Sequence, residues 1–309
     1  MINQCTLAAP LTFSGVGVHS GQIIHVTLRP AQSGNGIIFY RNMGDRIVSI
    51  KACSENVVDT RMATVLGRNG ASVATVEHLL GALYSFGIDN LNIDIDGPEV
   101  PVMDGSALFY VEKIRAIGIK KLHATRKYLS IRKPISLASG EKRINIIPSR
   151  FFRITFKIAF DHPCIGTESH TIKVTPESFL QEIAPARTFG FMKEFEYLKA
   201  NNLAKGASFK NTVVVGDNAV LNPEGLRFPD EFVRHKMLDI IGDFSLLGFP
   251  ILGHIKASKS GHEFNHEMVQ KILASPECWK LAEFSEQDLE EAFQLQPETC
   301  FGKAVLSQV

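Results

Sequence analysis

Two separate stretches of the chain share one pattern, a helical segment followed by a strand, and this internal repeat is the feature that most constrains the fold. EHLLGALYSFGIDNLNIDI begins at Glu77, and RHKMLDIIGDFSLLGFPILGHI begins at Arg234. Superposing them places His78 on His235, although few other residues are identical. The repeat predicts two similarly built α/β layers, packed face to face, with one histidine from each half near a cleft between them.

The periodicity of apolar residues predicts the elements of both halves. In IIHVTLRP, Ile24, Val26 and Leu28 alternate with polar residues, and FRITFKIAF alternates in the same way from Phe152. From Ser72 to Gly87 apolar residues recur at helical spacing, and NLNIDIDG then returns to strict alternation. Strands and helices in this order predict an α+β fold.

The chain is long enough for two domains. It has 309 residues, 45% of them hydrophobic. A basic, poorly periodic segment at 119–127 separates a first domain at 1–122 from a second at 128–280, and 281–309 is a tail without an assigned role. Within the second domain, residues 191–215 form an insert with spaced apolar side chains. This insert is either a lining for a hydrophobic ligand or a helix packed on the surface.

Charge and composition exclude some classes of protein. With 33 basic and 32 acidic side chains, the chain lacks the broad positive field of nucleic-acid binders. No apolar run approaches the ~18 to 20 residues of a membrane span, and the first residues do not resemble a signal peptide. We therefore expect a cytoplasmic protein without a transmembrane segment. The five scattered cysteines have the spacing of neither a disulfide framework nor a thiolate zinc site.

One segment offers ligands for a metal. In RHKMLDIIGD, His235, Asp239 and Asp243 stand at i, i+4 and i+8, on one stripe of a helix. Catalytic zinc commonly takes three protein ligands and leaves a position for water. His78 is the natural third ligand, because its neighbour Glu77 supplies a carboxylate where a general base belongs.

Spacing alone leaves two interpretations open. A histidine beside a carboxylate on a helix is more often a surface pair or a hydrogen-bonded core residue than a metal ligand. His262, in KSGH, is a candidate acid or a loop histidine bonded to backbone, and His19, in GVGVHSG, could simply cap a turn.

Several motifs together resemble a known family, the zinc-dependent UDP-3-O-acyl-N-acetylglucosamine deacetylases of lipid A biosynthesis. They run in order from the start of the chain to about Trp279. The motifs are GVGVHSG, NVVDTRMATVLG, TVEHLLGAL, EVPVMDGSA, ARTFGF, GLRFPDEFVRHKMLD followed by GD, and KSGH.

The resemblance implies two α/β sandwich domains of like topology, each with an insert, and an active site between them. It implies Zn²⁺ bound by His78, His235 and Asp239. Glu77 would be the general base for zinc-bound water. A protonated His262, oriented by Asp243, and the hydroxyl of Thr188 would stabilise the oxyanion. Either His262 or Glu77 would protonate the leaving amine, and the residues do not choose between them.

The resemblance also implies contacts to a UDP-linked acylated amino sugar. Near the uridine diphosphate it places Lys236, Lys259, and Phe160 with Asp161. For the acyl chain it implies a passage lined by Phe189, Met192 and Phe209. The chain departs from the family at Glu263, beside His262, where the family commonly has a small apolar residue.

Two other functions remain possible. One is a deacetylase of another acylated amino sugar, and the other is a non-catalytic module that binds nucleotide-linked lipids. The presence of a candidate base beside a candidate ligand argues against the second. Nothing in the residues fixes the oligomeric state, and a monomer is the default expectation.

Overall fold

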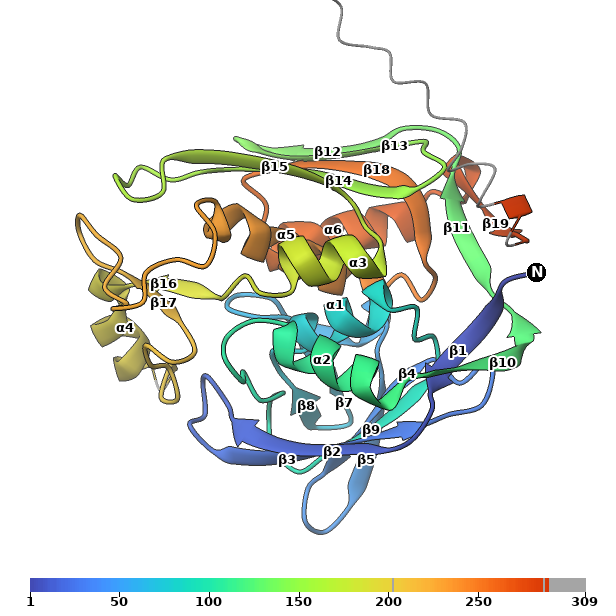
Figure 1. The fold of residues 1–309 in the computed structure, drawn as a ribbon, viewed down its shortest axis with the longest axis horizontal. Coiled ribbons are helices and arrows are strands. Elements are labelled where there is room, and N and C mark those ends of the chain that lie inside the picture. Colours follow the sequence, from blue (N-terminus) through green and yellow to red (C-terminus); the bar gives the residue numbers. More distant parts are fainter. Residues whose placement is uncertain (202, 286, 289–309) are drawn as a thin grey trace, which may run out of the picture.

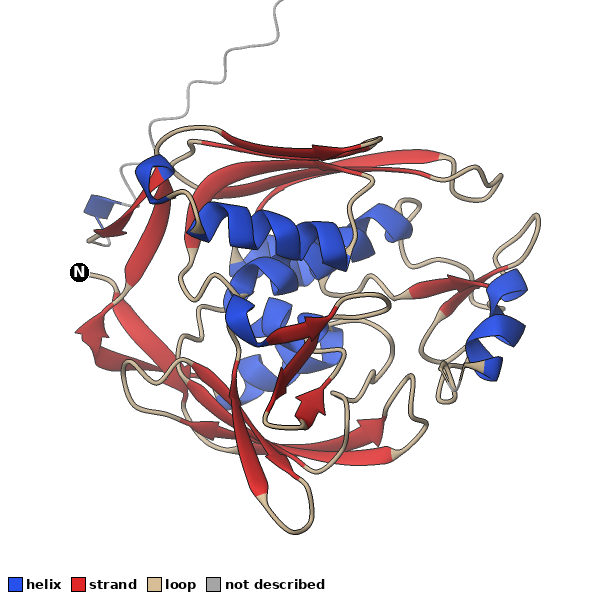
Figure 2. Ribbon diagram, turned by 180° about the vertical axis from the view of Figure 1, so that it is seen from behind, coloured by secondary structure: helices blue, strands red, loops and turns tan. Residues whose placement is uncertain are grey.

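The computed structural model describes the chain except for residues 202, 286 and 289–309 (Figure 1). Two sheets form the outer layers, and the longer helices lie between them (Figure 2). This is the α+β fold that the sequence predicts. Most of the tail lies outside the described residues.

The first half contains a five-stranded sheet and two helices. In spatial order its strands are β2 (Leu11–Val16), β3 (Ile23–Pro30), β9 (Leu91–Ile95), β4 (Ile37–Asn42) and β5 (Ile47–Lys51). Only β4 and β9 pair in parallel. Helix α1 (Glu77–Ser85) precedes β9, and α2 (Leu108–Ile117) follows it. As expected from the alternation, Ile24, Val26 and Leu28 of β3 are buried.

The second half repeats this arrangement strand for strand. Its order is β12 (Ile135–Ser139), β13 (Lys142–Ile147), β18 (Ile251–Ser258), β14 (Phe152–Ala159) and β15 (Thr167–Lys173). Here too only the third and fourth strands pair in parallel. Helix α5 (Glu231–Ser245) precedes β18, and α6 (His262–Leu273) follows it. The internal repeat is therefore confirmed, and α1 and α5 are equivalent helices.

Each half carries an insert between its fifth strand and the helix that precedes its central strand. The first contains η1 (Ser54–Asn56), β6 (Val57–Asp59), β7 (Val65–Arg68) and β8 (Ala71–Val73). The second contains α3 (Pro176–Ser178), the π-helical turn η2 (Phe179–Ile183), β16 (Phe189–Phe191), η3 (Met192–Glu194), α4 (Phe195–Ala200) and β17 (Val213–Val215).

The expected start of the first helix is wrong. Val73 belongs to β8 and pairs with Leu66, and the helix begins only at Glu77. Between them Thr75 has a φ of 57°, which a continuous right-handed helix does not allow. The apolar spacing at 73–83 arises because strand and helix bury side chains in the same core.

Further strands lie outside these two sets of five. β10 (Ile119–Thr125) pairs with β1 (Asn3–Leu7), and β11 (Lys127–Ile131) pairs with β18. After η4 (Pro276–Cys278), β19 (Trp279–Glu283) also pairs with β11. The sheet thus continues three residues past the predicted domain end at 280. The four described cysteines are free thiols.

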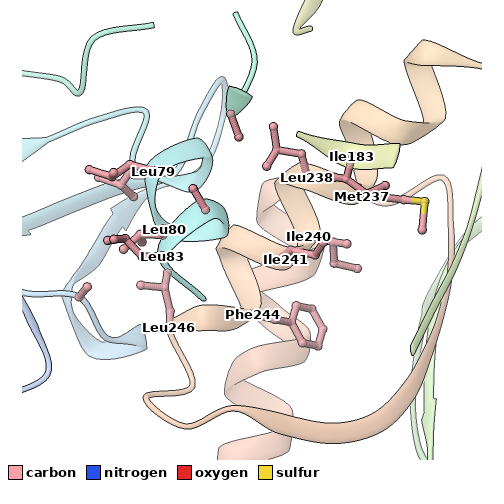
Figure 3. Close-up of a cluster of buried hydrophobic side chains, with 14 of the residues drawn as sticks. Leu79, Leu80, Leu83, Ile183, Met237, Leu238, Ile240, Ile241, Phe244 and Leu246 are labelled. Atoms are coloured by element: carbon pink, nitrogen blue, oxygen red, sulfur yellow. The ribbon is translucent and has the colours of Figure 1, made fainter. Parts of the chain in front are cut away.

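The core of the molecule lies where α1 packs against α5 (Figure 3). Leu79, Leu80 and Leu83 of α1 are buried, as are Leu238 and Ile241 of α5. Burying a side chain of this size stabilises a fold by about 1.5–3 kcal/mol. This packing fixes the two helices that carry the predicted ligands.

Candidate active site

Three predicted metal ligands meet at the contact between α1 and α5. Nε2 of His78 lies 3.6 Å from Oδ1 of Asp239, and Nε2 of His235 lies 3.4 Å from the same oxygen. The two imidazole rings are 4.9 Å apart and nearly perpendicular. One ligand atom from each residue falls within 4.8 Å of the others, and all three side chains are buried.

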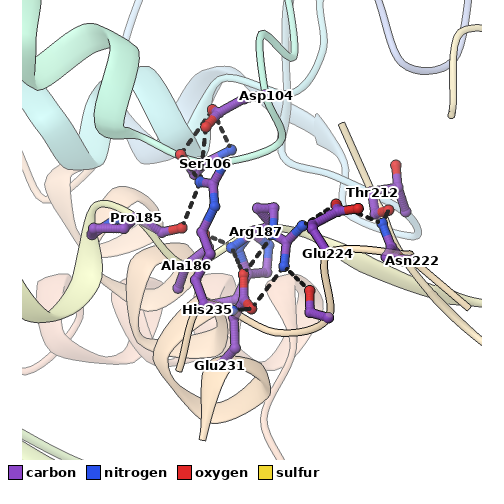
Figure 4. Close-up of polar contacts among 12 residues, drawn as sticks. Asp104, Ser106, Pro185, Ala186, Arg187, Thr212, Asn222, Glu224, Glu231 and His235 are labelled. Carbon is purple, nitrogen blue, oxygen red and sulfur yellow. Dashed lines mark hydrogen bonds and ion pairs between the residues drawn. The ribbon is translucent and has the colours of Figure 1, made fainter. Parts of the chain in front are cut away.

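The donor atoms suit a divalent metal. Oδ1 of Asp239 is buried and has no hydrogen-bond partner among the described residues. An unpaired buried carboxylate oxygen is costly unless something else binds it. Nδ1 of His235 donates to the backbone oxygen of Ala186 at 3.1 Å, which leaves Nε2 as an acceptor (Figure 4). Burial lowers the pKa of His235 to about 3, so this ring is neutral at physiological pH.

A second group of titratable side chains borders the first. Nε2 of His262 lies 3.9 Å from Oε1 of Glu77 and 3.9 Å from Oδ2 of Asp239. Nδ1 of His262 contacts Oδ2 of Asp243 at 3.0 Å. Burial by itself lowers the pKa of His262, but Asp243, Asp239 and Glu77 outweigh it and raise the pKa to about 9. These carboxylates thus favour the protonated form of His262. Glu77, Asp239 and His262 also form a second set of atoms close enough together to hold a metal ion.

Glu77 is a better proton acceptor than an exposed glutamate. It is buried at the start of α1, and burial raises its pKa above that of an ordinary glutamate. The charges of His262 and His78 act in the opposite direction. Its Oε2 accepts a hydrogen bond from the backbone N–H of Thr64 at 3.1 Å, which aims the carboxylate.

Thr64 is a residue that the sequence reasoning missed. Its hydroxyl donates to Oδ1 of Asp243 at 2.5 Å, so one residue of the first insert touches both Glu77 and Asp243. On the opposite oxygen, Asp243 accepts from Nδ2 of Asn265 at 2.8 Å. The only signal available was the position of Thr64 within the motif NVVDTRMATVLG, where no spacing distinguishes it from its neighbours.

Lys236 contacts one of the predicted metal ligands. Its Nζ contacts Oδ2 of Asp239 at 2.8 Å and lies 5.4 Å from the centre of the Phe189 ring. Burial lowers the pKa of Lys236, but the charge of Asp239 outweighs it and the net shift is upward. An ammonium has three donors and this bond uses one, so Lys236 keeps donors for the predicted phosphate contact.

A cavity of about 710 Å³ opens over the site. Glu77, His78, His235, Lys236, Asp239 and His262 line it, together with Thr188 and Phe189. The second insert supplies the apolar side chains Phe191, Met192, Phe195, Leu198 and Phe209. Of the two interpretations of the insert, the lining is therefore the one that the structure supports.

Three predicted contact residues do not line this cavity. Nζ of Lys259 pairs with Glu141 at 2.9 Å at the surface. Phe160 stacks edge-on against Phe189, which does line the cavity, and Asp161 is exposed. Their contacts with a nucleotide remain predictions.

Two further residues line the cavity. The backbone N–H groups of His19 and Ser20 donate to Glu99, and Nδ1 of His19 is buried without a hydrogen-bond partner in the described part of the chain. His19 is thus one of the residues that line the cavity. Glu263, the departure from the family pattern, is exposed at the cavity edge.

None of the described helices is long and apolar enough to cross a membrane.

Known proteins match this chain over most of its length. The profile of the family described as UDP-3-O-acyl N-acetylglycosamine deacetylase matches residues 4–274. The UDP-3-O-acyl-N-acetylglucosamine deacetylase of Syntrophotalea carbinolica is 62% identical over 286 residues, which cover 93% of each chain. The protein of the same name from Geotalea uraniireducens is 53% identical, over 92% of this chain and 93% of its own. The one from Myxococcus xanthus is 48% identical, over 93% of this chain and 92% of its own.

The residues matched by the family profile include every segment that lines the cavity, from Val18 to Phe264. Identity near or above one half over nine-tenths of both chains leaves no room for a different fold or for a partial domain match. The chain belongs to the UDP-3-O-acyl N-acetylglycosamine deacetylase (LpxC) family.

Proposed function

We propose that this chain hydrolyses the N-acetyl amide of UDP-3-O-acyl-N-acetylglucosamine, an early step of lipid A biosynthesis, with Zn²⁺ held by His78, His235 and Asp239. The observation that carries the proposal is the buried, unpaired Oδ1 of Asp239, which faces both imidazole Nε2 atoms. Two imidazoles and a carboxylate are donors that zinc prefers, and this set leaves a coordination position free. The name shared by the relatives supports the same substrate.

When bound, Zn²⁺ supplies a Lewis acid that polarises the amide carbonyl and acidifies water. Glu77 accepts the proton of the attacking water. Its buried carboxylate suits this task, because a raised pKa makes a stronger proton acceptor. The hydrogen bond from Thr64 leaves Oε1 of Glu77 directed toward His262 and the cavity.

His262 stabilises the negative charge that develops on the carbonyl oxygen and protonates the departing amine. The imidazolium is held at Nδ1 by Asp243, so Nε2 carries the proton toward the cavity. Thr188, on the cavity wall, adds a hydroxyl donor to the same oxygen. An amine leaves poorly unless protonated, which is why an acid distinct from Glu77 is useful here.

Substrate binding follows the cavity. We assign the diphosphate to Lys236, with Lys259 and the pair Phe160 and Asp161 nearer the surface. The acyl chain would follow the apolar wall that Phe189, Met192 and Phe209 contribute. A mostly apolar lining with a few placed polar groups is the usual form of a small-molecule site.

The division into domains at 1–122 and 128–280, the cytoplasmic location and the monomeric state are also part of this proposal. A nucleotide-linked substrate supports the location, because such compounds are made and used inside the cell. The strand-for-strand repeat supports the division into two domains.

Acetate release tests the proposal. Purified protein is given UDP-3-O-acyl-N-acetylglucosamine, with and without prior removal of metal by a chelator, and then with Zn²⁺ restored. We expect activity that the chelator abolishes and Zn²⁺ recovers. Equal turnover of the acylated sugar without uridine diphosphate would indicate a deacetylase of other amino sugars. Tight binding without any acetate release would indicate a binding module.

A further inference from the structure

The carbonyl oxygen that orients His235 lies in a segment without regular secondary structure. Ala186 accepts the Nδ1 hydrogen bond at 3.1 Å, but the residues between η2 and β16 belong to no helix or strand. Thr188, two residues on, receives its own support from the backbone of Gly105 and Val213. The N–H of Ala186 donates to the backbone oxygen of Ile183 at 3.0 Å. Its carbonyl belongs to the same planar peptide unit as the N–H of Arg187, so contacts of Arg187 act directly on the direction of that carbonyl.

Arg187 is tied to the first residue of α5. Its backbone N–H and its Nε donate to Oε1 of Glu231 at 2.9 and 2.8 Å, and its Nη2 donates to Oε2 at 3.1 Å (Figure 4). Oε2 also accepts from the backbone N–H of Arg227 at 2.6 Å. The side chains of Arg187 and Glu231 are 2% and 1% exposed, so solvent barely screens this pair.

The contact of Glu231 with Arg187 and that of His235 with Ala186 connect α5 to the loop at two neighbouring points. Glu231 holds Arg187, and His235, one helical turn further on, holds Ala186. Neighbouring residues of the loop thus contact residues at i and i+4 of α5, on the same face of the helix. Together these two contacts fix the direction of the Ala186 carbonyl. Through that carbonyl they fix the rotation of the His235 imidazole.

Stability alone does not account for a pair this deeply buried. Removing both charges from water is expensive, and well-packed apolar residues often stabilise a fold as well or better. Arg187 also reaches Oε1 of Glu224 at 2.7 Å and the backbone oxygen of Gly225 at 2.7 Å. Glu224 and Gly225 lie between β17 and α5, so these bonds connect that segment to the loop that orients His235.

We propose that Arg187 and Glu231 are positioning residues for the metal, acting through the Ala186 carbonyl on His235. The inference rests on the proposed metal site. Partners that orient a ligating histidine typically change metal affinity by about 10–100-fold when they are mutated. The pair should therefore affect metal affinity more than its effect on folding explains.

Zn²⁺ affinity, measured by competition with a chelator, tests this without any assay of activity. Glu231→Gln keeps the shape of the side chain but puts an NH₂ group against N–H donors, and we expect the dissociation constant for Zn²⁺ to rise about 10–100-fold. Arg187→Lys keeps the charge but loses the planar fork, and we expect a smaller rise. Arg187→Lys can test the inference by itself if Glu231→Gln does not fold.

The control is Arg126→Lys, which alters a partly buried arginine, paired with Asp89 at 2.8 Å away from the cavity. The melting temperature of each metal-free variant measures its structural damage. If the Arg187 and Glu231 variants lose Zn²⁺ affinity no more than Arg126→Lys at a similar loss of melting temperature, the inference is wrong. If the wild-type protein itself binds no stoichiometric Zn²⁺, the proposed metal site fails, and the inference fails with it.

Discussion

Nε2 of His78 lies 3.6 Å from Oδ1 of Asp239, although the two residues belong to equivalent helices of different halves. In the proposed site, helix α1 contributes one metal ligand and the general base, and α5 contributes two ligands and Asp243, which orients the acid. Neither half contains the site by itself. The internal repeat therefore creates the site only when its halves are docked, and variants that separate metal binding from catalysis provide the most direct test.

His78→Ala and Glu77→Gln change adjacent residues with different expected effects. His78→Ala removes one of three ligands, so we expect the purified protein to lose its metal and its acetate release together. Glu77→Gln leaves the ligands intact but removes the base, so we expect metal to be retained and kcat to fall about 10²–10⁴-fold. Metal content by atomic absorption, measured beside acetate release, checks both.

Glu263→Gln is the matched control for the base, because Glu263 also lines the cavity but is exposed and touches no ligand in the described residues. We expect its kcat within a few-fold of the wild type. Comparable losses in Glu263→Gln and Glu77→Gln would argue that charge in the cavity matters and that Glu77 has no special role.

Thr64→Val removes the hydroxyl that donates to Asp243 and keeps the backbone N–H that donates to Glu77. A buried carboxylate oxygen that loses its donor costs about 1–3 kcal/mol, so we expect a lower free energy of unfolding. Asp243 then holds His262 less well, and kcat should fall about tenfold or more while KM changes little. Thr64→Ser restores the hydroxyl and should recover most of the kcat. An unchanged kcat in Thr64→Val would show that the hydroxyl serves folding alone.

Thr64 also shows what the sequence could and could not predict. The helical stripe of His235, Asp239 and Asp243 follows from spacing within one element, so it was predictable. The pairing with His78 was predictable from the repeat. Thr64 and the Ala186 carbonyl act through contacts with residues far away in the sequence, and no local pattern encodes such contacts. Every residue has a backbone carbonyl, so the residue type at position 186 does not indicate that its carbonyl contacts His235.

The error at the start of α1 has a similar cause. Val73 and Val76 have helical spacing, but the positive φ of Thr75 separates a strand from a helix. Periodicity reports which side chains face the core and does not report the path of the backbone between them. The contact of Lys236 with Asp239 was missed because a lysine three residues before a carboxylate on a helix is common on surfaces.

Asp243→Asn should change the pH dependence of the reaction. His262 has a pKa of about 9, against the effect of burial, and Asp243 is the main cause of the rise. The acid is charged below this pKa, so activity should fall as pH rises through about 9. Without the Asp243 charge the pKa of His262 drops, and the basic limb of the pH profile of kcat should move to lower pH by roughly 1 unit or more. A basic limb that stays in place in this variant would assign that limb to another group.

Gly242→Ala should weaken both the fold and the reaction, although alanine favours a helix by about 1 kcal/mol over glycine. A Cβ on Gly242 would lie 2.1 Å from the backbone oxygen of Glu77, so α1 and α5 must move apart at the turn that carries the base. Overpacking of this kind costs about 1–3 kcal/mol, which outweighs the helical preference. Displacing a catalytic group by about 1 Å can cost about 10²-fold in rate.

Gly81→Ala, on the facing helix, is the comparison that isolates this effect. Its Cβ would meet the tip of the Leu238 side chain at 3.0 Å, which can turn away, and its nearest backbone atom lies at 3.4 Å. We expect Gly81→Ala to change the free energy of unfolding by less than about 1 kcal/mol and to keep most of its kcat. Urea unfolding and acetate release on both variants measure the difference. If the two alanines behave alike, close contact between the helices at Glu77 does not determine the position of the base.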